Sequence, residues 1–380
     1  MFSFMATTIT GFEDVLAGEI RELLNVRVEC GYGRVFFSSG FDSVYKVNLS
    51  SRCTHKLFLV LARTKIQGLD DIYKETKKLD FRFLVKPSQT FAVRSERHGS
   101  HPFTSLDVAS KVGQAIIDSY KDSTGVRLKV NLKNPDLEFY AFVRYNEFIL
   151  ALNTTGESLH RRGYRVYNHP AALKTSLACC MLRYGGWNPS QPLLDPMCGG
   201  GTIPIEAALM AEQKTLDSFK RDFAFKKLKL FDENLYLKTR ESLALKAKVK
   251  PKIFGVEISP KHLEGAKLNA LSAGVAEDIT FILGDATKLQ KYLDKNFKPK
   301  FVAVNLPYGI RSSRKNVLEK LYKEFLFSLK NVTDKAILVA LTSAKEYFKK
   351  ALEATGFMEV DEREVMHGNL KVTVFKCVVE

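Results

Sequence analysis

Asn305, Leu306, Pro307 and Tyr308 form the stretch of the chain that is best suited to chemistry. They follow an apolar run, residues 301–304, that predicts a buried parallel strand. An amide oxygen and a neighbouring backbone carbonyl at a strand end can accept hydrogen bonds from an exocyclic amine, while an aromatic ring stacks on the base that carries it. These residues could also be only a polar turn that ends a core strand. If they are functional, the pattern favours methyl transfer to a planar amine.

Three further polar side chains, Asp195, Glu257 and Asp285, also follow predicted strands. Ligands of open α/β sheets bind beyond the carboxyl ends of the strands. Together with Asn305 this makes four polar strand ends in succession, more than chance would place there. A glycine-rich loop, residues 199–201, follows the first of these strands and allows a ligand to approach the backbone closely. The sequence therefore predicts a ligand site at this edge of the sheet.

These parts fit S-adenosylmethionine. The glycine loop would lie beside its methionine moiety, Glu257 would accept both ribose hydroxyls and Asp285 would accept the adenine amine, although either carboxylate could instead be a helix cap or a solvated loop residue. The dinucleotide fingerprint fails because Pro204 replaces its third glycine, and no Lys-Ser/Thr pair marks a phosphate-binding P-loop. The predicted cofactor residues are Asp195, Met197, Cys198, Gly199, Gly201, Thr202, Glu257, Ile258, Asp285, Ala286 and Asn305.

The second half of the chain, from about His169, alternates strands with helices, which predicts a parallel sheet covered by helices on both faces. The predicted strands are 193–194, 253–256, 279–283, 301–304, 335–341, 358–365 and 371–379. The last two are too close together for a crossover helix and must form a hairpin, so the final strand enters the sheet antiparallel. This order is typical of a Rossmann-like class I methyltransferase sheet and not of an all-parallel dehydrogenase sheet.

Two helices that follow the polar strand ends have clear boundary signals. Thr202 is the predicted cap of the first, residues 203–211, which has Pro204 in its first turn. The second begins after its cap, Ser259, and ends at Gly274.

An insertion, residues 213–252, accounts for the long separation between Asp195 and Glu257. It is rich in Lys and Phe. This composition predicts either a surface that grips a nucleic-acid backbone or an amphipathic helix that packs on the core.

The first half, up to about Arg165, is predicted to be an α+β region without a nucleotide-binding motif. Its predicted strands are 5–9, 35–37, 57–63, 90–94, 126–130, 140–143 and 148–152, and its predicted helices are 12–24 and 105–120, the second capped by Ser105.

Composition limits the partners. The net charge of +16 over 380 residues favours a polyanionic partner, because Lys and Arg neutralise phosphates. The six cysteines show no CxxC pair or disulfide-like spacing, so we expect reduced, mostly buried thiols inside the cell. No apolar run is long enough to span a membrane, and His98 and His101 lack companion metal ligands. We therefore expect a cytoplasmic protein without a metal or a membrane anchor.

Several blocks of the sequence resemble a known family. DPMCGGGTIPIEAA, residues 195–208, and NLPYGIR, residues 305–311, are similar to the THUMP-containing RNA guanine-N2 methyltransferases. FAVRSERHG, residues 91–99, and GESLHRRGYR, residues 156–165, resemble the THUMP domain and its linker. The resemblance implies a ferredoxin-like subdomain over 1–50, a THUMP RNA-binding domain over 51–155, a linker over 156–170 and a methyltransferase domain over 171–380.

Within this family the chain is most similar to the archaeal tRNA enzymes that form N2-methylguanosine at position 6 of the acceptor stem. The resemblance implies that the THUMP domain holds the CCA end of tRNA, that the target base is flipped out, and that Asn305, Leu306, Pro307 and Tyr308 are catalytic. The expected RNA contacts are Arg94, Arg97, Arg161, Arg162, Arg165, Arg311, Arg314 and Lys315. Many relatives have proline where this chain has Leu306. Leucine frees the φ angle and adds an N–H, so we expect a less rigid turn, and the choice between guanine N2 and adenine N6 stays open.

Alternatives remain at this point. They are a ribosomal RNA guanine-N2 methyltransferase, a nucleic-acid adenine-N6 methyltransferase, a protein glutamine methyltransferase and a non-catalytic RNA-binding adaptor. The four intact polar strand ends argue against an adaptor, and the THUMP-like half and the positive charge favour RNA over protein. We expect a monomer, since no isolated apolar stripe marks an oligomer interface.

Overall fold

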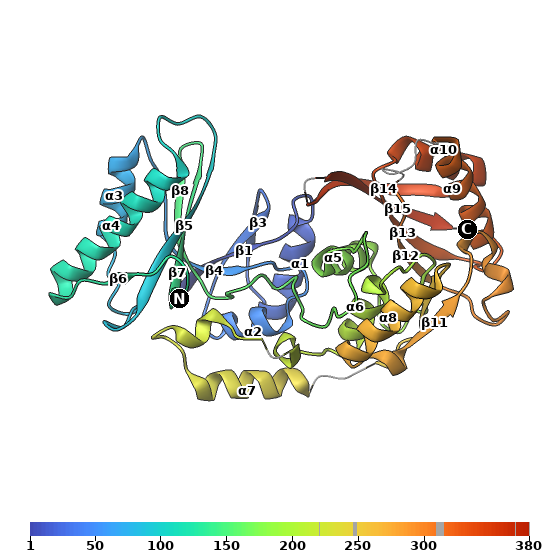
Figure 1. Ribbon diagram of the computed structural model, residues 1–380, viewed down its shortest axis with the longest axis horizontal. Helices are drawn as coiled ribbons and strands as arrows, with labels where there is room; N and C mark the ends of the chain where they lie inside the picture. Colours follow the sequence, from blue (N-terminus) through green and yellow to red (C-terminus); the bar gives the residue numbers. More distant parts are fainter. Residues whose placement is uncertain (220, 246–248, 309–314, 369, 380) are drawn as a thin grey trace.

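The computed structural model describes residues 1–219, 221–245, 249–308, 315–368 and 370–379. The first half of the chain builds one β-sheet and the second half builds another. The two sheets lie one after the other along the long axis of the molecule (Figure 1).

The first sheet is continuous across the predicted ferredoxin-like and THUMP segments. Its order is β2-β3-β1-β4-β8-β7-β5-β6. The strands are β1 (Phe2–Thr7), β2 (Val28–Gly31), β3 (Arg34–Ser39), β4 (Leu57–Lys65), β5 (Thr90–His98), β6 (Lys129–Val130), β7 (Leu137–Arg144) and β8 (Glu147–Asn153). Because β4 pairs antiparallel with β1 on one side and with β8 on the other, it joins the two segments into one unit.

Four helices accompany this sheet: α1 (Glu13–Leu24), α2 (Ser43–Ser50), α3 (Leu69–Lys77) and α4 (Ser105–Thr124). The predicted cap of α4 was Ser105, but Thr104 is the cap. The Thr104 hydroxyl accepts a hydrogen bond from the Asp107 N–H, and the Asp107 carboxylate accepts one from the Thr104 N–H. This reciprocal pair satisfies two backbone donors, which a cap at Ser105 would not do.

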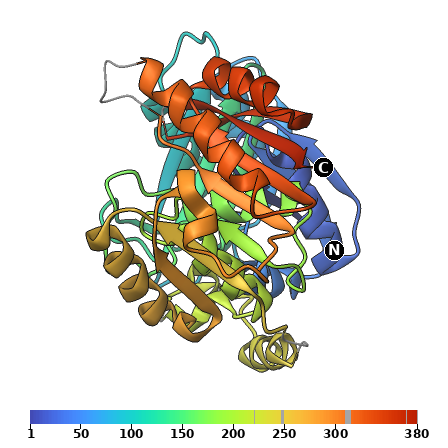
Figure 2. The same ribbon diagram turned by 90° about the vertical axis from the view of Figure 1, so that its right-hand side faces the viewer.

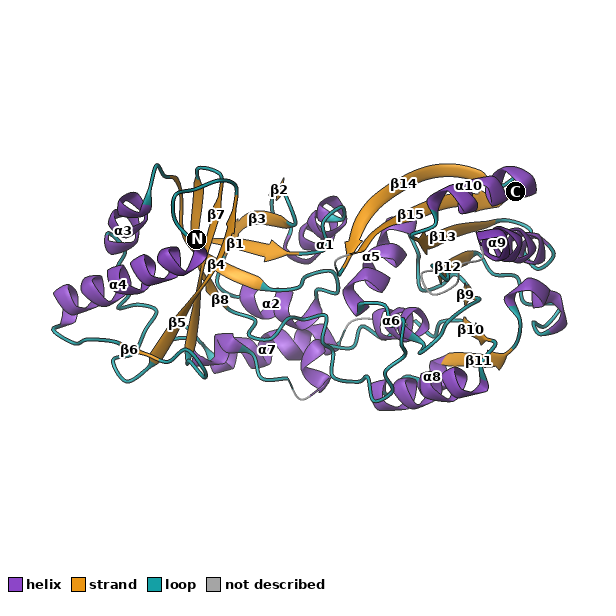
Figure 3. Ribbon diagram, turned by 45° about the horizontal axis from the view of Figure 1, so that its top comes forward, coloured by secondary structure: helices purple, strands orange, loops and turns teal. Residues whose placement is uncertain are grey.

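The second sheet has the order β11-β10-β9-β12-β13-β15-β14. Its strands are β9 (Leu193–Asp195), β10 (Ile253–Glu257), β11 (Ile279–Leu283), β12 (Phe301–Asn305), β13 (Ala336–Thr342), β14 (Met358–His367) and β15 (Leu370–Val379). The first five run parallel, whereas β15 is antiparallel to both β13 and β14. The predicted antiparallel final strand is confirmed, and Figure 3 shows the β14–β15 hairpin as two long curved strands.

Helices cover both faces of the second sheet, as the alternating pattern predicts. They are α5 (Thr175–Gly185), α6 (Thr202–Ala211), α8 (Pro260–Ala273), α9 (Lys315–Lys330) and α10 (Lys345–Thr355), with the short 3-10 helices η3 (Ala276–Asp278) and η4 (Ala286–Lys291) in the connections. The insertion holds α7 (Glu233–Ala244), which packs on α2, and the 3-10 helices η1 (Leu216–Phe219) and η2 (Ala224–Lys227). Along β12, Phe301 and Ala303 pack in the cluster that contains α5, α6 and α8 residues, whereas Val302 and Val304 pack with α9 and α10. This alternation is the two-residue period of a strand that is buried on both faces. Figure 2 shows α9 and α10 set apart from α8.

Of the two helices with predicted boundaries near the polar strand ends, α8 has the predicted cap residues and α6 does not. Ser259 caps α8 through a hydrogen bond from the His262 N–H, and Gly274 ends the helix in the left-handed region, as predicted. In α6 the predicted cap Thr202 is instead the first helical residue. Gly201, with φ of +79°, occupies the cap position without a side chain.

The insertion packs on the first half of the chain. Phe223 and Phe225 are fully buried, and their rings stack with centroids 5.1 Å apart. Tyr45 of α2 contacts the Phe225 ring. Packing on the core is thus confirmed for the aromatic residues, while Lys226 and Lys227 are exposed.

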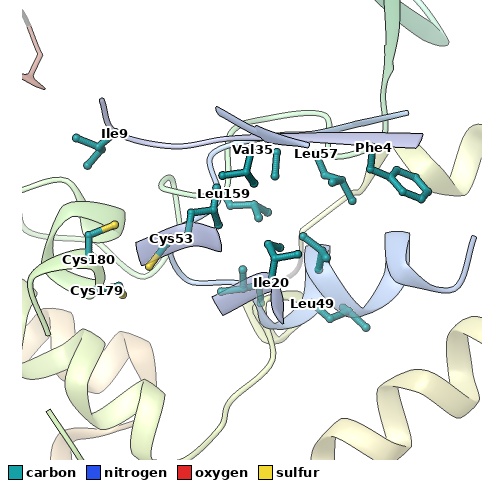
Figure 4. Packing of buried hydrophobic residues seen from close by; sticks show 14 of the residues in the cluster. Phe4, Ile9, Ile20, Val35, Leu49, Cys53, Leu57, Leu159, Cys179 and Cys180 are labelled. Atoms are coloured by element: carbon teal, nitrogen blue, oxygen red, sulfur yellow. The ribbon is translucent and has the colours of Figure 1, made fainter. Parts of the chain in front are cut away.

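One hydrophobic core runs from the first half into the second. Ile20 and Cys53 from the first half, Leu159 from the linker and Cys179 and Cys180 from α5 belong to a single buried cluster, part of which Figure 4 shows. All six cysteines are free and five of them are buried, which confirms the predicted buried thiols.

Arg162 lies at this junction and not on the surface, so the prediction that it contacts RNA is wrong. Its guanidinium donates to the Glu206 carboxylate of α6 at 3.3 Å and to the carbonyls of Leu159 and Arg52 at 2.7 and 2.8 Å. The two charged side chains are 1% and 0% exposed. Burial acts to lower the pKa of Arg162, but the Glu206 carboxylate and other nearby groups together raise it, so the guanidinium keeps its charge. It joins the first half, the linker and the second sheet.

We predict that Glu206→Ala destabilises the protein by about 3–5 kcal/mol, because the Arg162 charge is left buried without a partner. Chemical denaturation followed by circular dichroism measures this change. Glu157→Ala is the matched control: it breaks the Arg161–Glu157 pair, whose side chains are 70% and 59% exposed, and should change stability little. Equal losses in the two variants would contradict the prediction.

A second prediction concerns pH. His55 and His160 lie at the same junction, with ring centroids 5.2 Å apart. Burial, aided by neighbouring positive groups, lowers the pKa of His55 to about 3 and that of His160 to about 4, from an ordinary value of 6.5. Between pH 6.5 and these lowered pKa values, the two histidines bind more protons in the unfolded chain than in the folded chain. Their contribution to stability is therefore fully present above pH 6.5 and is lost progressively as the pH falls.

We therefore expect the free energy of unfolding to be lower at pH 5 than at pH 7. Replacing both histidines by glutamine should make this dependence shallower. Denaturant titrations at the two pH values measure the difference, and an unchanged slope in the double variant would show that other groups cause it.

Candidate active site

The carboxyl ends of four adjacent strands meet at one edge of the second sheet. Strands β11, β10, β9 and β12 are neighbours in that order and run parallel. Asp285, Glu257, Asp195 and Asn305, which stand at or just after these ends, line one open cavity of about 890 Å³. The structure thus brings together the four polar residues that the sequence places at strand ends.

Most of the predicted cofactor residues line this cavity. They are Asp195, Met197, Cys198, Gly199, Thr202, Glu257, Ile258, Asp285, Ala286 and Asn305. Gly201 has a different place: a Cβ atom there would lie 3.1 Å from Ala266, so this glycine lets the loop pack closely on α8. Gly200, which was not among the predicted residues, lines the cavity.

A hydrogen bond ties the glycine loop to the end of β10. The N–H of Gly199, whose φ is +54°, donates to Glu257 Oε2 at 3.0 Å. Glu257 Oε1 accepts from the Ser259 N–H at 2.9 Å. The carboxylate is thereby held in one orientation, and each oxygen keeps a lone pair for a ligand hydroxyl.

Asp195 is a buried carboxyl without a cationic partner among the described residues. Burial raises its pKa well above the ordinary value, and Glu257 adds to this, while the hydrogen bond from the Met197 N–H opposes it. A cationic ligand beside Asp195 would favour the ionised carboxylate.

The pKa of Asp285 is shifted in the opposite direction, below its ordinary value. Burial acts to raise its pKa, but hydrogen bonds from the Thr287 N–H and hydroxyl, together with the charge of Lys288, outweigh burial and lower it. Asp285 is therefore an ionised acceptor that can receive a hydrogen bond from an amine. Asp285 is also the cap of η4, so the helix cap that the sequence left as an alternative is present as well.

These residues fit S-adenosylmethionine. The volume of the cavity is in the range of small-molecule sites, and the glycine loop exposes backbone to it. Asp195 suits a cationic group, Glu257 suits paired hydroxyls and Asp285 suits an amine. The cofactor carries all three of these groups, so the fit rests on complementary chemistry around a single cavity.

Asn305 and Tyr308 meet beside the predicted cofactor residues. The Tyr308 hydroxyl donates to Asn305 Oδ1 at 2.8 Å, and both side chains line the cavity. Burial, with a contribution from Tyr322, raises the pKa of Tyr308, so the hydroxyl keeps its proton at neutral pH. Asn305 Oδ1 has a second lone pair, which remains available to an amine.

The turn after Asn305 is fixed by hydrogen bonds on both sides of Leu306. The Leu306 N–H donates to the Leu341 carbonyl at 2.9 Å and so extends the pairing of β12 with β13. The Pro307 carbonyl accepts from the Tyr322 hydroxyl of α9. A proline at position 306 could not make the first of these bonds, so the predicted loosening by leucine is offset.

Two histidines that the sequence analysis missed also line the cavity: His169 and His367. Nδ1 of His367 lies 3.5 Å from the Tyr308 hydroxyl. Burial, followed by the charge of Lys174, lowers the pKa of His367, so its imidazole is neutral at pH 7. His367 ends β14, far along the chain from the other site residues, and no local motif marks it.

The expected RNA contacts are dispersed. Arg94 pairs with Glu138, Arg97 donates to the Gly99 carbonyl, and both lie on β5 in the first sheet. Arg161 is exposed on the linker, and Arg165 donates to the Leu173 carbonyl and to Thr202 Oγ1 beside the glycine loop. Arg311 and Arg314 lie outside the described residues, as does the side chain of Lys315, the first residue of α9.

Two kinds of feature are absent from the described residues. In that part of the chain, no helix is both long enough and apolar enough to cross a membrane. The same residues hold no group of three or more His, Cys, Asp or Glu side chains that could bind a metal ion.

Comparisons with known proteins agree with this geometry. Three family models match the chain: an RlmL ferredoxin-like domain over residues 3–58, a THUMP domain over 67–153 and an RMKL-like methyltransferase domain over 162–373. Two solved structures have a similar fold, each with a TM-score of 0.87. One, described as a possible methylase from Clostridium difficile 630, is 26% identical, and the other, a protein crystallised with SAH, is 24% identical; each alignment covers 99% of this chain and 97% of the other.

Among curated relatives, the tRNA (guanine(6)-N2)-methyltransferase of Archaeoglobus fulgidus is 41% identical over 98% of this chain and 91% of that protein. The enzyme of the same name from Methanocaldococcus jannaschii is 38% identical over 94% and 93%. The ribosomal RNA large subunit methyltransferase K/L of Aliivibrio fischeri is 31% identical over 87% of this chain but only 48% of that protein. The chain therefore belongs to the RMKL-like family of S-adenosylmethionine-dependent RNA methyltransferases, in which a ferredoxin-like segment and a THUMP domain precede the methyltransferase domain.

Proposed function

We propose that this chain transfers a methyl group from S-adenosylmethionine to N2 of the guanosine at position 6 of the tRNA acceptor stem, forming N2-methylguanosine. The observation that carries the proposal is the position of Asn305 and Leu306 at the end of β12, in the same cavity as the glycine loop. Two relatives that match nearly the whole chain, both tRNA (guanine(6)-N2)-methyltransferases, support the choice of base and RNA.

The exocyclic amine of guanine is a poor nucleophile because its lone pair is delocalised into the ring. Asn305 Oδ1 would accept one N–H through its remaining lone pair, and the Leu306 carbonyl would accept the other. Both acceptors would hold the amine as it becomes pyramidal and would direct its lone pair. Bound S-adenosylmethionine supplies an electrophilic methyl group. The rate enhancement would then come mainly from orientation and fixed dipoles.

Tyr308 would stack on the target base. A base in a paired stem must first be flipped out, at a cost of a few kcal/mol, and stacking on an aromatic ring offsets part of this cost. The hydrogen bond to Asn305 holds the Tyr308 ring beside the amide in advance of substrate binding. The same contact therefore positions both the stacking surface and the hydrogen-bond acceptor.

The first sheet would bind the rest of the tRNA. We propose that its THUMP part holds the CCA end, with Arg94 and Arg97 of β5 and the exposed Arg161 among its phosphate contacts. The net charge of +16 supports a polyanionic substrate. We further propose that the protein acts as a cytoplasmic monomer.

Ribosomal RNA is the second candidate substrate. The relative from Aliivibrio fischeri, a ribosomal RNA methyltransferase, supports it, although this chain spans about half the length of that protein.

The test is a transfer assay with labelled S-adenosylmethionine on unmodified tRNA transcripts and ribosomal RNA, followed by nucleoside analysis and mapping. N2-methylguanosine at position 6 of tRNA is the expected product. N2-methylguanosine in ribosomal RNA alone would show that ribosomal RNA, and not tRNA, is the substrate. N6-methyladenosine would show that the target base is adenine and not guanine. Label in neither RNA would overturn the proposal.

We predict that Asn305→Ala lowers kcat by about 10²–10³-fold, as removal of a fixed transition-state contact does in other enzymes. Cofactor affinity should change little, since the amide acts on the amine. Single-turnover transfer and isothermal titration calorimetry measure the two quantities. Asn188→Ala, outside the cavity, is the matched control, and near wild-type turnover of Asn305→Ala would remove the amide from the mechanism.

We also predict that Asp285→Ala weakens cofactor binding by about 10-fold or more, because a hydrogen bond to a charged group contributes roughly 1.5–3 kcal/mol. Calorimetry with S-adenosylhomocysteine measures this without turnover. The exposed Asp294 is a suitable control position for the same substitution. Unchanged affinity in Asp285→Ala would exclude this carboxylate from the adenine site.

A further inference from the structure

Residues 165–169, here called the strap, lie near the end of the linker and cross the glycine loop on the way into the second half of the chain. A single buried amide, Asn269 of α8, fixes this segment. Its Oδ1 accepts from the N–H groups of Val166 and Tyr167 at 2.9 and 2.8 Å. Its Nδ2 donates to the carbonyls of Tyr167 and Gly200 at 3.1 and 3.0 Å. Asn269 is 1% exposed, so the strap and the glycine loop are held by the same side chain.

The side chain of Tyr167 seats the strap on α8. A Cβ atom at Gly265 would lie 2.2 Å from the Tyr167 ring, so only glycine leaves room for the ring at this position. The Tyr167 hydroxyl is 2.6 Å from Nδ1 of His262. These contacts give the last strap residue, His169, a defined position.

His169 covers the glycine loop from the side of the cavity. A Cβ atom at Gly199 would lie 3.4 Å from Nε2 of this ring, and one at Gly200 would lie 3.1 Å from the His169 Cβ. The Ala171 N–H donates to Nδ1 at 3.1 Å, so a neutral ring carries its hydrogen on Nε2. Burial, followed by the nearby His262, lowers the pKa of His169 and favours this neutral form. His169 therefore brings an N–H donor to the cavity.

Positive charge also gathers beside the glycine loop. Thr202 begins α6, so the N-terminal end of that helix, with its unpaired N–H groups and partial positive charge, adjoins the loop. Arg165, at the other end of the strap, donates to Thr202 Oγ1 at 3.0 Å. This side of the glycine loop thus suits an anionic group, while Asp195 in the same cavity suits a cationic one. Asp285 lies after a different strand, β11.

We propose that His169 is a further cofactor-binding residue, whose Nε2–H donates to the carboxylate of the methionine moiety of S-adenosylmethionine. Asp285 and Glu257 have groups of the adenosine part as their proposed partners, which leaves the glycine-loop end for the amino-acid part. Its carboxylate needs donors there, and His169 supplies one from a rigid position. The inference rests on the cofactor and not on the identity of the RNA, so the two can fail separately.

The test compares two probes by calorimetry on the full chain without RNA. S-adenosylhomocysteine carries the carboxylate, and 5′-(3-aminopropyl)thioadenosine differs from it only by lacking this group. His169→Phe keeps a ring over Gly199 but removes the donor. We expect this substitution to weaken the binding of S-adenosylhomocysteine by about 10–100-fold, as for loss of a hydrogen bond to a charged group. Binding of the second probe should weaken by no more than about twofold.

His169→Gln places an amide N–H near the position of Nε2 and should recover most of the affinity for S-adenosylhomocysteine. Asn168→Ala, at an exposed strap position, is the control and should bind both probes normally. Equal weakening of both probes by His169→Phe would show that the ring only supports the loop. Unchanged binding of S-adenosylhomocysteine would show no contact, and either result would overturn the proposal.

Discussion

The buried ion pair between Arg162 and Glu206 constrains how the two halves of this protein can be arranged. Glu206 lies on α6, the helix that follows the glycine loop, and Arg162 also donates to the carbonyl of Arg52 in the first half. A charge in such a place is tolerated only while its partner and hydrogen bonds remain. The linker, the first half and the helix that presents the cofactor loop must therefore keep one relative position.

This constraint also determines the route of the chain toward the proposed cofactor site. Beyond Arg162, the chain passes Arg165, which donates to Thr202 at the start of α6. It then crosses α8, where the Asn269 side chain accepts hydrogen bonds from the chain's backbone. One wall of the cavity is thus built by the segment that comes from the first half of the chain. Movement of that half relative to the second sheet would disturb the cavity, because the same short segment connects both.

The turn after Asn305 shows how a change of residue type can be compensated by hydrogen bonding. Leucine at position 306 has a freer backbone than proline, but its N–H donates to Leu341 and its side chain is buried in the core. The turn is thereby attached to the neighbouring strand, while Tyr322 holds the next carbonyl. Rigidity that proline would provide through its ring is provided here by pairing with the sheet.

The sequence by itself was sufficient to predict the features that depend on local patterns. Apolar runs ending in Asp195, Glu257, Asp285 and Asn305 mark parallel strands whose carboxyl ends must share an edge. The short connection between the last two strands required a hairpin, and Ser259 and Gly274 marked the ends of a helix. These features follow from neighbours within a few residues, where backbone geometry and side-chain type leave few options.

Only the tertiary structure decided the features that depend on distant partners. Arg162 belongs to a basic run of the kind that is usually exposed. It is buried because it pairs with Glu206, 44 residues later in the sequence. His169 and His367 carry no motif and enter the cavity because α8 and the β14–β15 hairpin place them there. Long-range packing selects these contacts, since their energy comes from desolvation and close fit between elements that a linear pattern does not relate.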